Sequence, residues 1–571
     1  MRHWWQRYPA RLESELASLD EAGFSYVLEE DAKRTGRIVV HVEYADENYA
    51  CTIVVAYPVT YPRTIFSAYS KGFVDGRHKE HNQGKLCLYH DEHNAWNGEC
   101  VGVVLKDQIP KIFAVHTDAK NAGDFETDAG VQITGQLSYQ QNSVILQGEH
   151  QIPEEYNRGF LDLGILVSSD PNTCFRGVLV ALEDDKRNPL LNVTGNLNKL
   201  ITGRLRGRWI RLDKQPANFE AGVLNEAISL WPTLMNPVFN KGPDVTGLLF
   251  PVEVRKGETE YHWLFVVRYK VQSKTPGSKH IENRIQIANI RPDVMSPETM
   301  MARVPALHPL ATKKITMIGL GALGSAIAWQ LARAGVGEIR LVDFDHVTSG
   351  NAPRWIAGVI AAGINKVDWI GSQIASNYPA CEITGETYTI GAVYADAPIE
   401  NEYSLLGRIF DGADLIIDAT AELAVTSFIN DYALSMGIPM VWATGTAGAY
   451  GGVAGRISGD WRQSCWGCYQ REIAQATPSI DLPPAEDGAE ESVQTIGCFH
   501  PTFTGTGFDM DHVSLMATRL AIATLCRGQE GAYPDFDWDV AVLSLRDDEG
   551  NPIPSKWKTH QLAKHPECDE H

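Results

Sequence analysis

The pattern of hydrophobic and polar positions changes twice along the 571-residue chain. Residues 1–118 begin with the pattern of a helix at 9–21 and continue with alternating segments at 37–43 and 51–57, which predict antiparallel strands. A proline-punctuated stretch then leads to a loop rich in His, Asn and Gly. We therefore expect residues 1–118 to form an α+β domain.

The second region, residues 119–300, has short runs typical of strands, such as 177–182 and 261–271, separated by turns of Gly, Pro and Asn. It contains no motif that indicates a chemistry, no internal repeat and no low-complexity tract. We interpret it as a β-rich connecting domain that positions its neighbours.

The third region, residues 301–571, alternates the patterns of strands and helices. The predicted strands are 314–319, 338–343, 413–418 and 439–443, and the predicted helices are 322–334 and 427–436. Such an alternation builds a mostly parallel sheet covered by helices. We therefore expect an α/β protein whose last domain is Rossmann-like.

Charge and cysteine usage narrow the class of partner and the compartment. Fifty Lys and Arg residues against 71 Asp and Glu leave a formal net charge of -21, which opposes binding to nucleic acid and to anionic membranes. No run of apolar residues reaches the length of a membrane span, and the first residues do not show the pattern of a signal peptide. Ten scattered cysteines do not resemble a disulfide framework. We expect a cytoplasmic protein whose thiolates serve chemistry or bind metal.

A glycine-rich turn follows the first strand of the third region. Gly319, Gly321 and Gly324 permit a tight turn and close approach of phosphates, while the following helix presents its N-terminus. Asp343 ends the next strand, about 20 residues downstream, where a carboxylate grips ribose hydroxyls in dinucleotide folds. By themselves these residues favour NAD.

Further polar residues after the second strand favour adenylation instead. Asp345, Asn351, Arg354 and Lys366 add carboxylate, amide, guanidinium and ammonium groups that hydride transfer does not need. Attack of a carboxylate on the α-phosphate of ATP builds charge on the phosphates, which Arg354, Lys366 and a metal ion would stabilise. Structural salt bridges on a surface loop are the alternative explanation.

With these residues the region resembles the ubiquitin-activating (ThiF/MoeB) superfamily, which includes bacterial enzymes that adenylate sulfur-carrier proteins. The likeness covers most of 305–571 through GLGALGS, LVDFDHVTSGNAPRW and the lysine that follows. The resemblance implies an ATP and Mg²⁺ site in which Asp343 and Asp345 contact ribose and metal, and Asn351, Arg354 and Lys366 hold the triphosphate. It also implies a homodimer in which Arg303 reaches the nucleotide of the neighbouring subunit.

One segment departs from that superfamily. Its members usually carry an Asp-Asn pair shortly after the strand that ends in Asp418, whereas this chain reads Asp418-Ala-Thr-Ala-Glu422. The carboxylate that binds Mg²⁺ is therefore open between Asp418 and Glu422.

Two short-spaced pairs of ligands predict structural zinc. Cys465 and Cys468 offer two thiolates from one turn, and Cys568 and His571 close the chain at the same spacing. Four such ligands suit tetrahedral Zn²⁺. A redox pair is the alternative for the first two cysteines.

Cys498 is the candidate nucleophile of the third region. It follows the acidic segment 481–491, and the surrounding GCFHPTFTG resembles the catalytic loop of ubiquitin-activating enzymes. A thiolate there would attack an acyl-adenylate and keep the activation free energy in a thioester, with His500 assisting its formation. A small buried cysteine is the alternative.

Cys87 is the candidate thioester acceptor of the first region. It lies in HKEHNQGKLCLY, between YPVTYP and Trp96, which resembles the active site of ubiquitin-conjugating enzymes over about 100 residues. The family's usual His-Pro-Asn triplet is absent. The resemblance therefore leaves His78, His81 or Asn82 to stabilise the oxyanion. A core cysteine between two leucines is the alternative.

An activating-like domain behind a conjugating-like domain resembles the bacterial fusion enzymes of CBASS anti-phage operons. That resemblance implies activation of the C-terminus of a cGAS-like nucleotidyltransferase, transfer through Cys498 and Cys87, and conjugation to a lysine of a target protein. Two alternatives remain: an adenylyltransferase for sulfur-carrier proteins, and a nucleotide-binding scaffold without catalysis.

Overall fold

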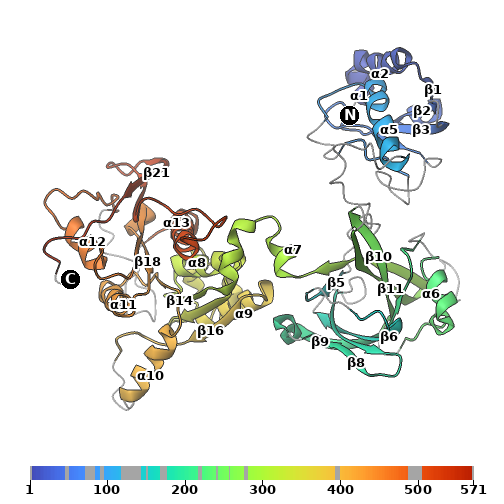
Figure 1. The fold of residues 1–571 in the computed structure, drawn as a ribbon. Coiled ribbons are helices and arrows are strands. Elements are labelled where there is room, and N and C mark those ends of the chain that lie inside the picture. The colour runs from blue at the N-terminus through green and yellow to red at the C-terminus, as the bar shows by residue number, and fades with distance from the viewer. Residues whose placement is uncertain are drawn as a thin grey trace. The chain divides into compact units, whose positions relative to one another are not determined.

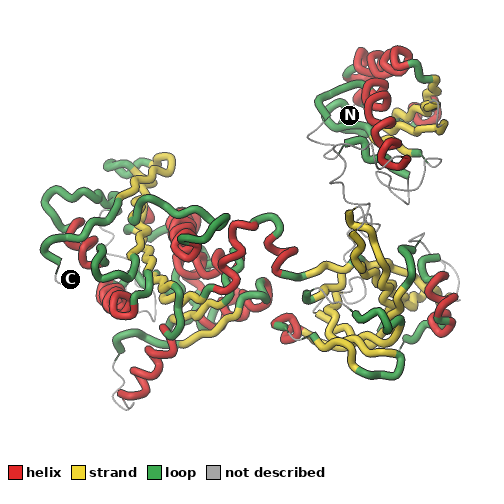
Figure 2. The backbone as a smooth tube through the Cα atoms, in the orientation of Figure 1, coloured by secondary structure: helices red, strands yellow, loops and turns green. Residues whose placement is uncertain are grey.

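Three β-sheets organise the protein (Figures 1 and 2). The computed structural model describes residues 3–45, 50–70, 84–89, 96–117, 143–148, 152–166, 176–193, 195–216, 222–239, 242–255, 258–274, 281–392, 399–486 and 504–568. The chain divides into two compact units, residues 1–194 with 201–294, and residues 195–200 with 295–571. Among the described helices, none is long and apolar enough to cross a bilayer.

The first sheet is an antiparallel meander of four strands with its helices packed beside it. The strands are β1 (Ser25–Leu28), β2 (Ile38–Ala45), β3 (Ala50–Tyr57) and β4 (Ser67–Tyr69), and the helices are α1 (Trp4–Arg7), α2 (Pro9–Ala22), α3 (Glu30–Arg34) and α5 (Val101–Thr117). Helix α2 and strands β2 and β3 confirm the elements predicted from the pattern. Helices α2 and α5 touch at Gly102, where a Cβ would lie 2.0 Å from the carbonyl oxygen of Ser18.

A buried carboxylate joins α2 to the first residue of α5. Glu15 is fully buried and pairs with Arg11 at 2.7 Å. It accepts hydrogen bonds from the hydroxyls of Tyr57 and Tyr61 and from the backbone N–H of Val101. Burial and the Glu15 charge raise the pKa of Tyr57, so the phenol stays a donor. Because every charge is paired, this network fixes the position at which α5 begins.

The second sheet has nine strands with an apolar core on each face. Its strands are β5 (Ser143–Leu146), β6 (Arg158–Leu166), β7 (Arg176–Asp184), β8 (Pro189–Asn192), β9 (Ile201–Arg211), β10 (Asp244–Arg255), β11 (Glu258–Lys274), β12 (Ile281–Ile290) and β13 (Pro292–Val294). The helices η3 (Asn196–Leu200), α6 (Asn225–Leu230) and η4 (Pro232–Met235) interrupt them. The prediction of a β-rich region is confirmed, and β7 and β11 include the two predicted strands.

The third sheet has eight strands in the order β16-β15-β14-β17-β18-β19-β20-β21. The strands are β14 (Lys314–Ile318), β15 (Glu338–Val342), β16 (Glu382–Glu386), β17 (Leu415–Asp418), β18 (Met440–Gly445), β19 (Gly451–Ile457), β20 (Val540–Arg546) and β21 (Pro552–His560). The first five are parallel, as expected for a Rossmann-like domain, and the last three continue the sheet as antiparallel strands.

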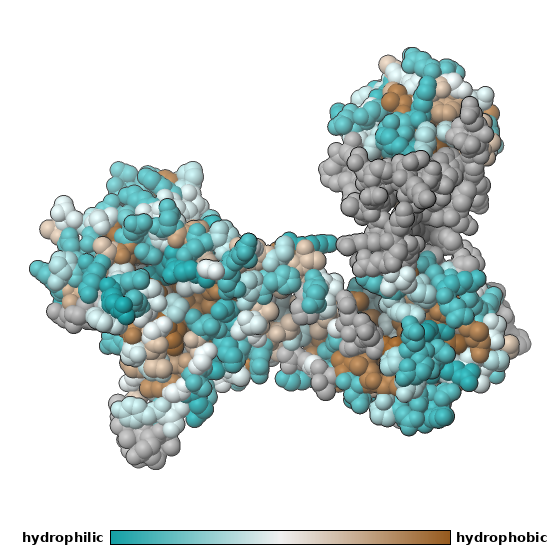
Figure 3. Space-filling view, viewed as in Figure 1, coloured by the Kyte–Doolittle hydropathy of each residue, from teal (hydrophilic) through white to brown (hydrophobic). Residues whose placement is uncertain are grey.

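Helices and short turns surround this third sheet. They are α7 (Pro297–Met301), η5 (Pro305–Thr312), α8 (Ala322–Arg333), η6 (Ser349–Asn351), η7 (Val359–Ala361), α9 (Lys366–Asn377), α10 (Ile399–Phe410), α11 (Leu423–Met436), η8 (Ala447–Ala449), α12 (Trp466–Ile473) and α13 (Gly507–Cys526). Helices α8 and α13 lie side by side, and the hydroxyl of Ser514 donates to the carbonyl oxygen of Leu323 at 3.3 Å. Hydrophilic side chains cover much of the visible surface (Figure 3).

The order of the parallel strands determines where a ligand can bind. Strand β14 has β15 on one side and β17 on the other. The chain continues from β14 to β15 and β16 on one side, and then crosses to β17 and β18 on the other side. In open α/β sheets the crevice at such a switch point, beyond the carboxyl ends of the strands, receives the ligand. The glycine-rich turn and Asp343 follow β14 and β15, and Asp418 ends β17.

Candidate active site

The glycine turn between β14 and α8 is shaped by two close approaches and one open position. Gly319 has φ +83°, and a Cβ there would lie 2.8 Å from the backbone of Ala419 and Thr420. A Cβ at Gly324 would lie 1.9 Å from the carbonyl oxygen of Gly319. At Gly321 a Cβ would meet nothing within 4 Å. The first and third glycines therefore allow tight packing of the turn, and the second leaves room at the N-terminus of α8, where anions bind.

Asp343 holds this turn against the end of β15. Its carboxylate accepts a hydrogen bond from the backbone N–H of Leu320 at 2.6 Å and another from Asp345 at 2.8 Å. From the other side, the indole N–H of Trp355 donates to the carbonyl oxygen of Leu320 at 2.7 Å. The side chain predicted to contact ribose thus also fixes the conformation of the turn.

Lys366 and Asp345 form the ion pair of the site. The Lys366 Nζ lies 2.7 Å from Asp345 Oδ2, and the Lys366 backbone N–H donates to the Asp345 carbonyl oxygen at 3.0 Å. Lys366 is buried at the first turn of α9, behind the N-cap Asn365, whereas Asp345 is half-buried. The structure therefore brings together a cation and a carboxylate that the sequence placed 21 residues apart.

Asn351 and Arg354 lie on the turn that follows β15. The side-chain oxygen of Asn351 accepts from the backbone N–H of Thr348 at 2.8 Å, and the Asn351 carbonyl oxygen accepts from the Arg354 backbone at 2.9 Å. A Cβ at Gly507 would lie 3.0 Å from the Arg354 Cα. The N-terminus of α13 therefore packs directly against the segment that carries the predicted phosphate ligand.

The carboxylate of Asp418 accepts hydrogen bonds from the loop and helix that follow it. Its buried carboxylate accepts from the backbone N–H of Thr420 at 3.0 Å, from the Thr420 hydroxyl at 2.7 Å and from the Thr426 hydroxyl at 2.5 Å. Burial raises the pKa of this carboxyl group. Glu422, the N-cap residue of α11, is exposed, and Ala421 has φ +58°. Of the two candidate metal ligands, Glu422 is the one exposed to solvent.

Three residues that shape the site, Thr420, Thr426 and Trp355, were not predicted from the sequence. Thr420 and Thr426 follow Asp418 by two and eight residues, and Thr426 stands one helical turn after the N-cap of α11. A hydroxyl residue at that spacing was the available signal. Arg303, the predicted contact to a second subunit, is exposed on the turn between α7 and η5.

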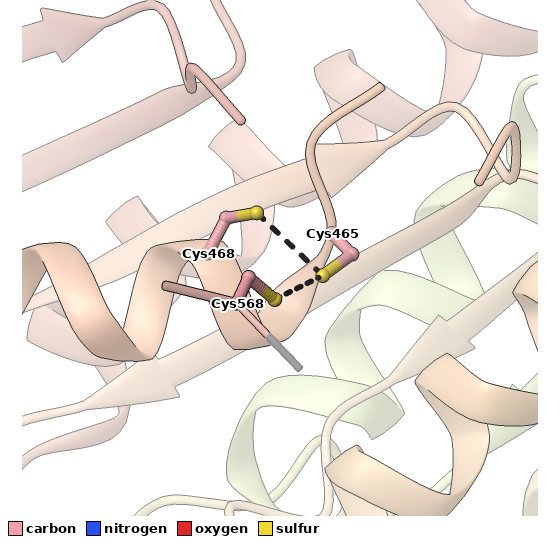
Figure 4. Close-up of side chains that lie close together, drawn as sticks. All are labelled: Cys465, Cys468 and Cys568. Atoms are coloured by element: carbon pink, nitrogen blue, oxygen red, sulfur yellow. Dashed lines mark hydrogen bonds between the residues drawn. The ribbon is translucent and has the colours of Figure 1, made fainter. Parts of the chain in front are cut away.

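Three buried thiols converge beside α12 (Figure 4). The Cys465 Sγ lies 3.7 Å from the Cys468 Sγ and 3.6 Å from the Cys568 Sγ. A disulfide would require about 2.0 Å, whereas thiolates at the corners of a zinc tetrahedron, with Zn–S about 2.3 Å, stand about 3.8 Å apart. The C-terminal segment therefore approaches the start of α12 with the spacing of metal ligands, across 103 residues of sequence.

The fourth position of this thiol cluster is not filled by the nearest described histidine. One ring nitrogen of His565 contacts the Gln475 amide at 2.9 Å, and the other accepts from the Glu567 backbone at 3.2 Å. The backbone N–H of His565 instead donates to the Cys468 sulfur at 3.2 Å. The predicted fourth ligand, His571, lies outside the described residues.

Cys87 is exposed between two buried leucines. Leu86 is fully buried and its backbone N–H donates to the Ala68 carbonyl oxygen at 2.8 Å, while Leu88 is 2% exposed. This alternation anchors the strand-like segment and turns the thiol outward, against the alternative of a core cysteine. The predicted supporting residues His78, His81 and Asn82, and the candidate nucleophile Cys498, lie outside the described residues.

Comparison with known families identifies the part of the chain that carries the nucleotide site. Residues 296–526 match the model of the ThiF family. This segment is a ThiF-family domain. It contains the glycine turn, the Lys366–Asp345 pair and the loop that Asp418 begins. The resemblance of the third region to the ubiquitin-activating superfamily is thereby confirmed.

One relative matches almost the whole chain, and two others match only part of it. The uncharacterized protein y4oA of Sinorhizobium fredii (strain NBRC 101917 / NGR234) is 26% identical over 99% of this chain and 97% of its own length. The ATP-dependent ubiquitin transferase-like protein Cap2 of Enterobacter hormaechei subsp. hoffmannii (strain UCI 50) is 23% identical over 50% of this chain and 47% of its own length. The adenylyltransferase and sulfurtransferase UBA4 of Yarrowia lipolytica (strain CLIB 122 / E 150) is 30% identical over 24% and 31%.

Solved structures are similar over a comparable part of the chain. Escherichia coli MccB, in a crystal structure with MccA-N7isoASN, is 18% identical and covers 47% of this chain and 69% of that chain, with a TM-score of 0.34. Among the named relatives, this chain matches less than half of the length of Cap2 and about a third of the length of UBA4.

Proposed function

We propose that this protein uses ATP to activate the C-terminal carboxylate of a protein substrate. It then transfers the resulting acyl group, through thioester intermediates, to a target amine. The observation that carries the proposal is the arrangement at the switch point of the ThiF-family domain. There the open glycine position, the Lys366–Asp345 pair and the exposed Glu422 follow neighbouring parallel strands.

In this proposal ATP lies over the glycine turn with its phosphates at the N-terminus of α8. Lys366 and Arg354 neutralise the charge that develops when the substrate carboxylate attacks the α-phosphorus and pyrophosphate leaves. Asp345 and Glu422 are the carboxylates suited to hold Mg²⁺, which prefers oxygen ligands. Bound there, Mg²⁺ would neutralise phosphate charge. Asp343 keeps the turn in its binding conformation and contacts the ribose.

The following steps use two thiols. The Cys498 thiolate attacks the acyl carbon of the acyl-adenylate, AMP leaves, and a thioester forms. The Cys87 thiolate then replaces Cys498 at the same carbon. Finally a lysine amine of the target attacks the thioester, an amide bond forms and the Cys87 thiolate leaves. The exposure of Cys87 between two buried leucines supports its role as the acceptor.

We further propose Zn²⁺ in the thiol cluster, with His571 as the fourth ligand. The separations of 3.6 and 3.7 Å between sulfur atoms and the burial of all three cysteines fit a closed structural site. Such an ion would join α12 to the C-terminal segment and stabilise the fold rather than take part in the reaction. Reduced thiols at this spacing suit a cytoplasmic protein.

The likeness to Cap2, an ATP-dependent ubiquitin transferase-like protein, supports a conjugation system, and we propose that this system serves defence against phage. Within it we propose a cGAS-like nucleotidyltransferase as the substrate whose C-terminus is activated, and a homodimer in which Arg303 completes the neighbouring nucleotide site. Residues 1–118 would then be the conjugating domain, 119–300 the connecting domain and 301–571 the activating domain.

Mass spectrometry under non-reducing conditions tests this proposal. Full-length protein is incubated with Mg-ATP and a cGAS-like nucleotidyltransferase. We expect a thiol-sensitive adduct on Cys87 that disappears in Cys498→Ala and in Cys87→Ala, and that persists in the control Cys51→Ala. An adduct on Cys87 that forms equally well in Cys498→Ala would contradict the order of transfer.

The likeness to UBA4 favours a second function, adenylation of a sulfur-carrier protein. In that case the Cys87→Ala variant would keep full activity. Exchange of labelled pyrophosphate into ATP in the presence of the substrate protein distinguishes both enzymes from a nucleotide-binding scaffold, which would show none.

A further inference from the structure

A polar pocket of about 300 Å³ lies away from the nucleotide site in the ThiF-family unit. Its floor is the end of β19, where Ile457 pairs with Met440, the first residue of β18. The candidate nucleotide ligands instead follow the last residues of the parallel strands, and Asp418 pairs with Trp442 two residues farther along β18. The pocket is therefore at the opposite edge of the sheet. Its lining residues are Arg456, Ile457, Ser458, Gln463, Ser464, Arg527, Asp539, Leu562 and Lys564.

The buried guanidinium group of Arg456, which lines the pocket, is already neutralised by ion pairs. Arg456 is buried and pairs with Asp535 at 2.5 Å and with Asp539 at 3.3 Å, and it donates to two backbone carbonyl oxygens. Arg527 pairs with Asp535 through its Nε at 2.7 Å. Two guanidinium groups thus face two carboxylates, and this part of the pocket has no net charge.

Lys564 adds a third positive charge to those of Arg456 and Arg527, which face the carboxylates of Asp535 and Asp539. Within the part of the chain that the structure describes, its ammonium group has no ion pair or hydrogen bond, and the Nη atoms of Arg527 have no partner either. Gln463 and Ser464 contribute an amide and a hydroxyl to the opposite wall. The groups still available are mainly donors, in a chain whose net charge is -21.

The two walls of the pocket lie next to the thiol cluster in the sequence. Gln463 and Ser464 come directly before Cys465, and Lys564 lies four residues before Cys568, whose sulfur is 3.6 Å from that of Cys465. Zn²⁺ bound to these thiols, as proposed above, would fix both segments. Lys564, Arg527 and Gln463 are exposed, and charged donors gathered at one cavity suit an oxygen anion.

We propose that this pocket binds the phosphate or carboxylate group of a small molecule, through Lys564, Arg527 and the wall donors. The cavity has room for such a group with a short organic part. The site is independent of the adenylation reaction, so that its occupant is not the ATP of the active site.

Isothermal titration calorimetry on the full-length protein tests this inference. Inorganic phosphate and acetate are titrated separately at equal ionic strength, with saturating ADP present so that the nucleotide site is occupied. The variants are Lys564→Ala and the charge-reversed Lys564→Glu, and the control is Lys556→Ala, which removes an exposed lysine of β21 outside the pocket.

We expect one binding site in the wild type. Its Kd should rise at least tenfold in Lys564→Ala and change less than twofold in Lys556→Ala, and Lys564→Glu should abolish binding. Tighter binding of phosphate would identify a phosphorylated ligand, and tighter binding of acetate a carboxylate. Absence of binding by the wild type, or equal affinity in wild type and Lys564→Ala, would overturn the inference. Thermal melting of each variant shows whether its fold is retained.

Discussion

The hydroxyl of Thr426 donates a hydrogen bond of 2.5 Å to the buried carboxylate of Asp418. This contact joins the end of β17 to the first turn of α11, and it fixes the loop whose backbone lies against Gly319. Asp418 therefore acts by positioning the glycine turn, and Glu422 is left as the carboxylate open to solvent.

Removal of this hydroxyl should weaken both the fold and ATP binding. In Thr426→Val the side chain keeps its shape but the buried carboxylate loses one donor, which costs about 1.5–3 kcal/mol for a hydrogen bond to a charged group. We expect a lower free energy of unfolding and a higher KM for ATP in pyrophosphate exchange. Thr426→Ser, which keeps the hydroxyl, serves as the control. Equal values in the two variants would show that Asp418 does not depend on this contact.

The Glu15 network should dominate the stability of the first sheet. Glu15→Ala leaves the Arg11 guanidinium and two tyrosine hydroxyls without their shared acceptor, and removing one partner of a buried pair costs about 3 kcal/mol. Hydrogen exchange measured by mass spectrometry should report faster opening of α2 and α5. Glu13→Ala, on the exposed face of the same helix, should leave exchange unchanged.

Asp535 should stabilise the fold at neutral pH and lose that contribution in acid. Burial raises its pKa, but hydrogen bonds from Arg456 and Arg527 outweigh that effect and hold the pKa below its ordinary value. A carboxyl group whose pKa is lowered on folding stabilises the protein above its unfolded pKa, about 3.9. That contribution is lost as pH falls through the lower, folded value.

Urea denaturation between pH 7 and pH 3 measures this contribution. Wild type should be more stable than Asp535→Asn at pH 7, and the difference should shrink as pH falls below about 4. Asp548→Asn is the control, since this exposed acid has no ion pair or side-chain hydrogen bond within the described chain. A difference that stays constant across the range would contradict the assignment.

The thiol cluster should hold one zinc ion for each chain. Elemental analysis of the purified protein should find about one equivalent, with most of it lost in Cys468→Ser and none lost in Cys51→Ser. Because the ion would join α12 to the C-terminal segment, its removal by a chelator should lower the melting temperature. Full occupancy in Cys468→Ser would rule out this cluster as the site.

Local patterns in the sequence were enough to predict the main elements of the site. The period of apolar residues predicted β14, α8 and β15, because a strand and a helix present their side chains at different intervals. The glycine spacing predicted the turn between them, because the steric requirement of that turn is local. The two short-spaced pairs of ligands likewise predicted all three clustered thiols.

The sequence by itself determined the three successive patterns, the glycine turn and the chemistry available to each candidate residue. Only the tertiary structure decided that the Asp418 carboxylate accepts hydrogen bonds from Thr420 and Thr426, and that Glu15 anchors the start of α5. It also decided the separation of 3.6 Å between the sulfur atoms of Cys568 and Cys465. These contacts join residues on different elements. Their partners follow from how sheets and helices pack, and no local period of the chain encodes that packing.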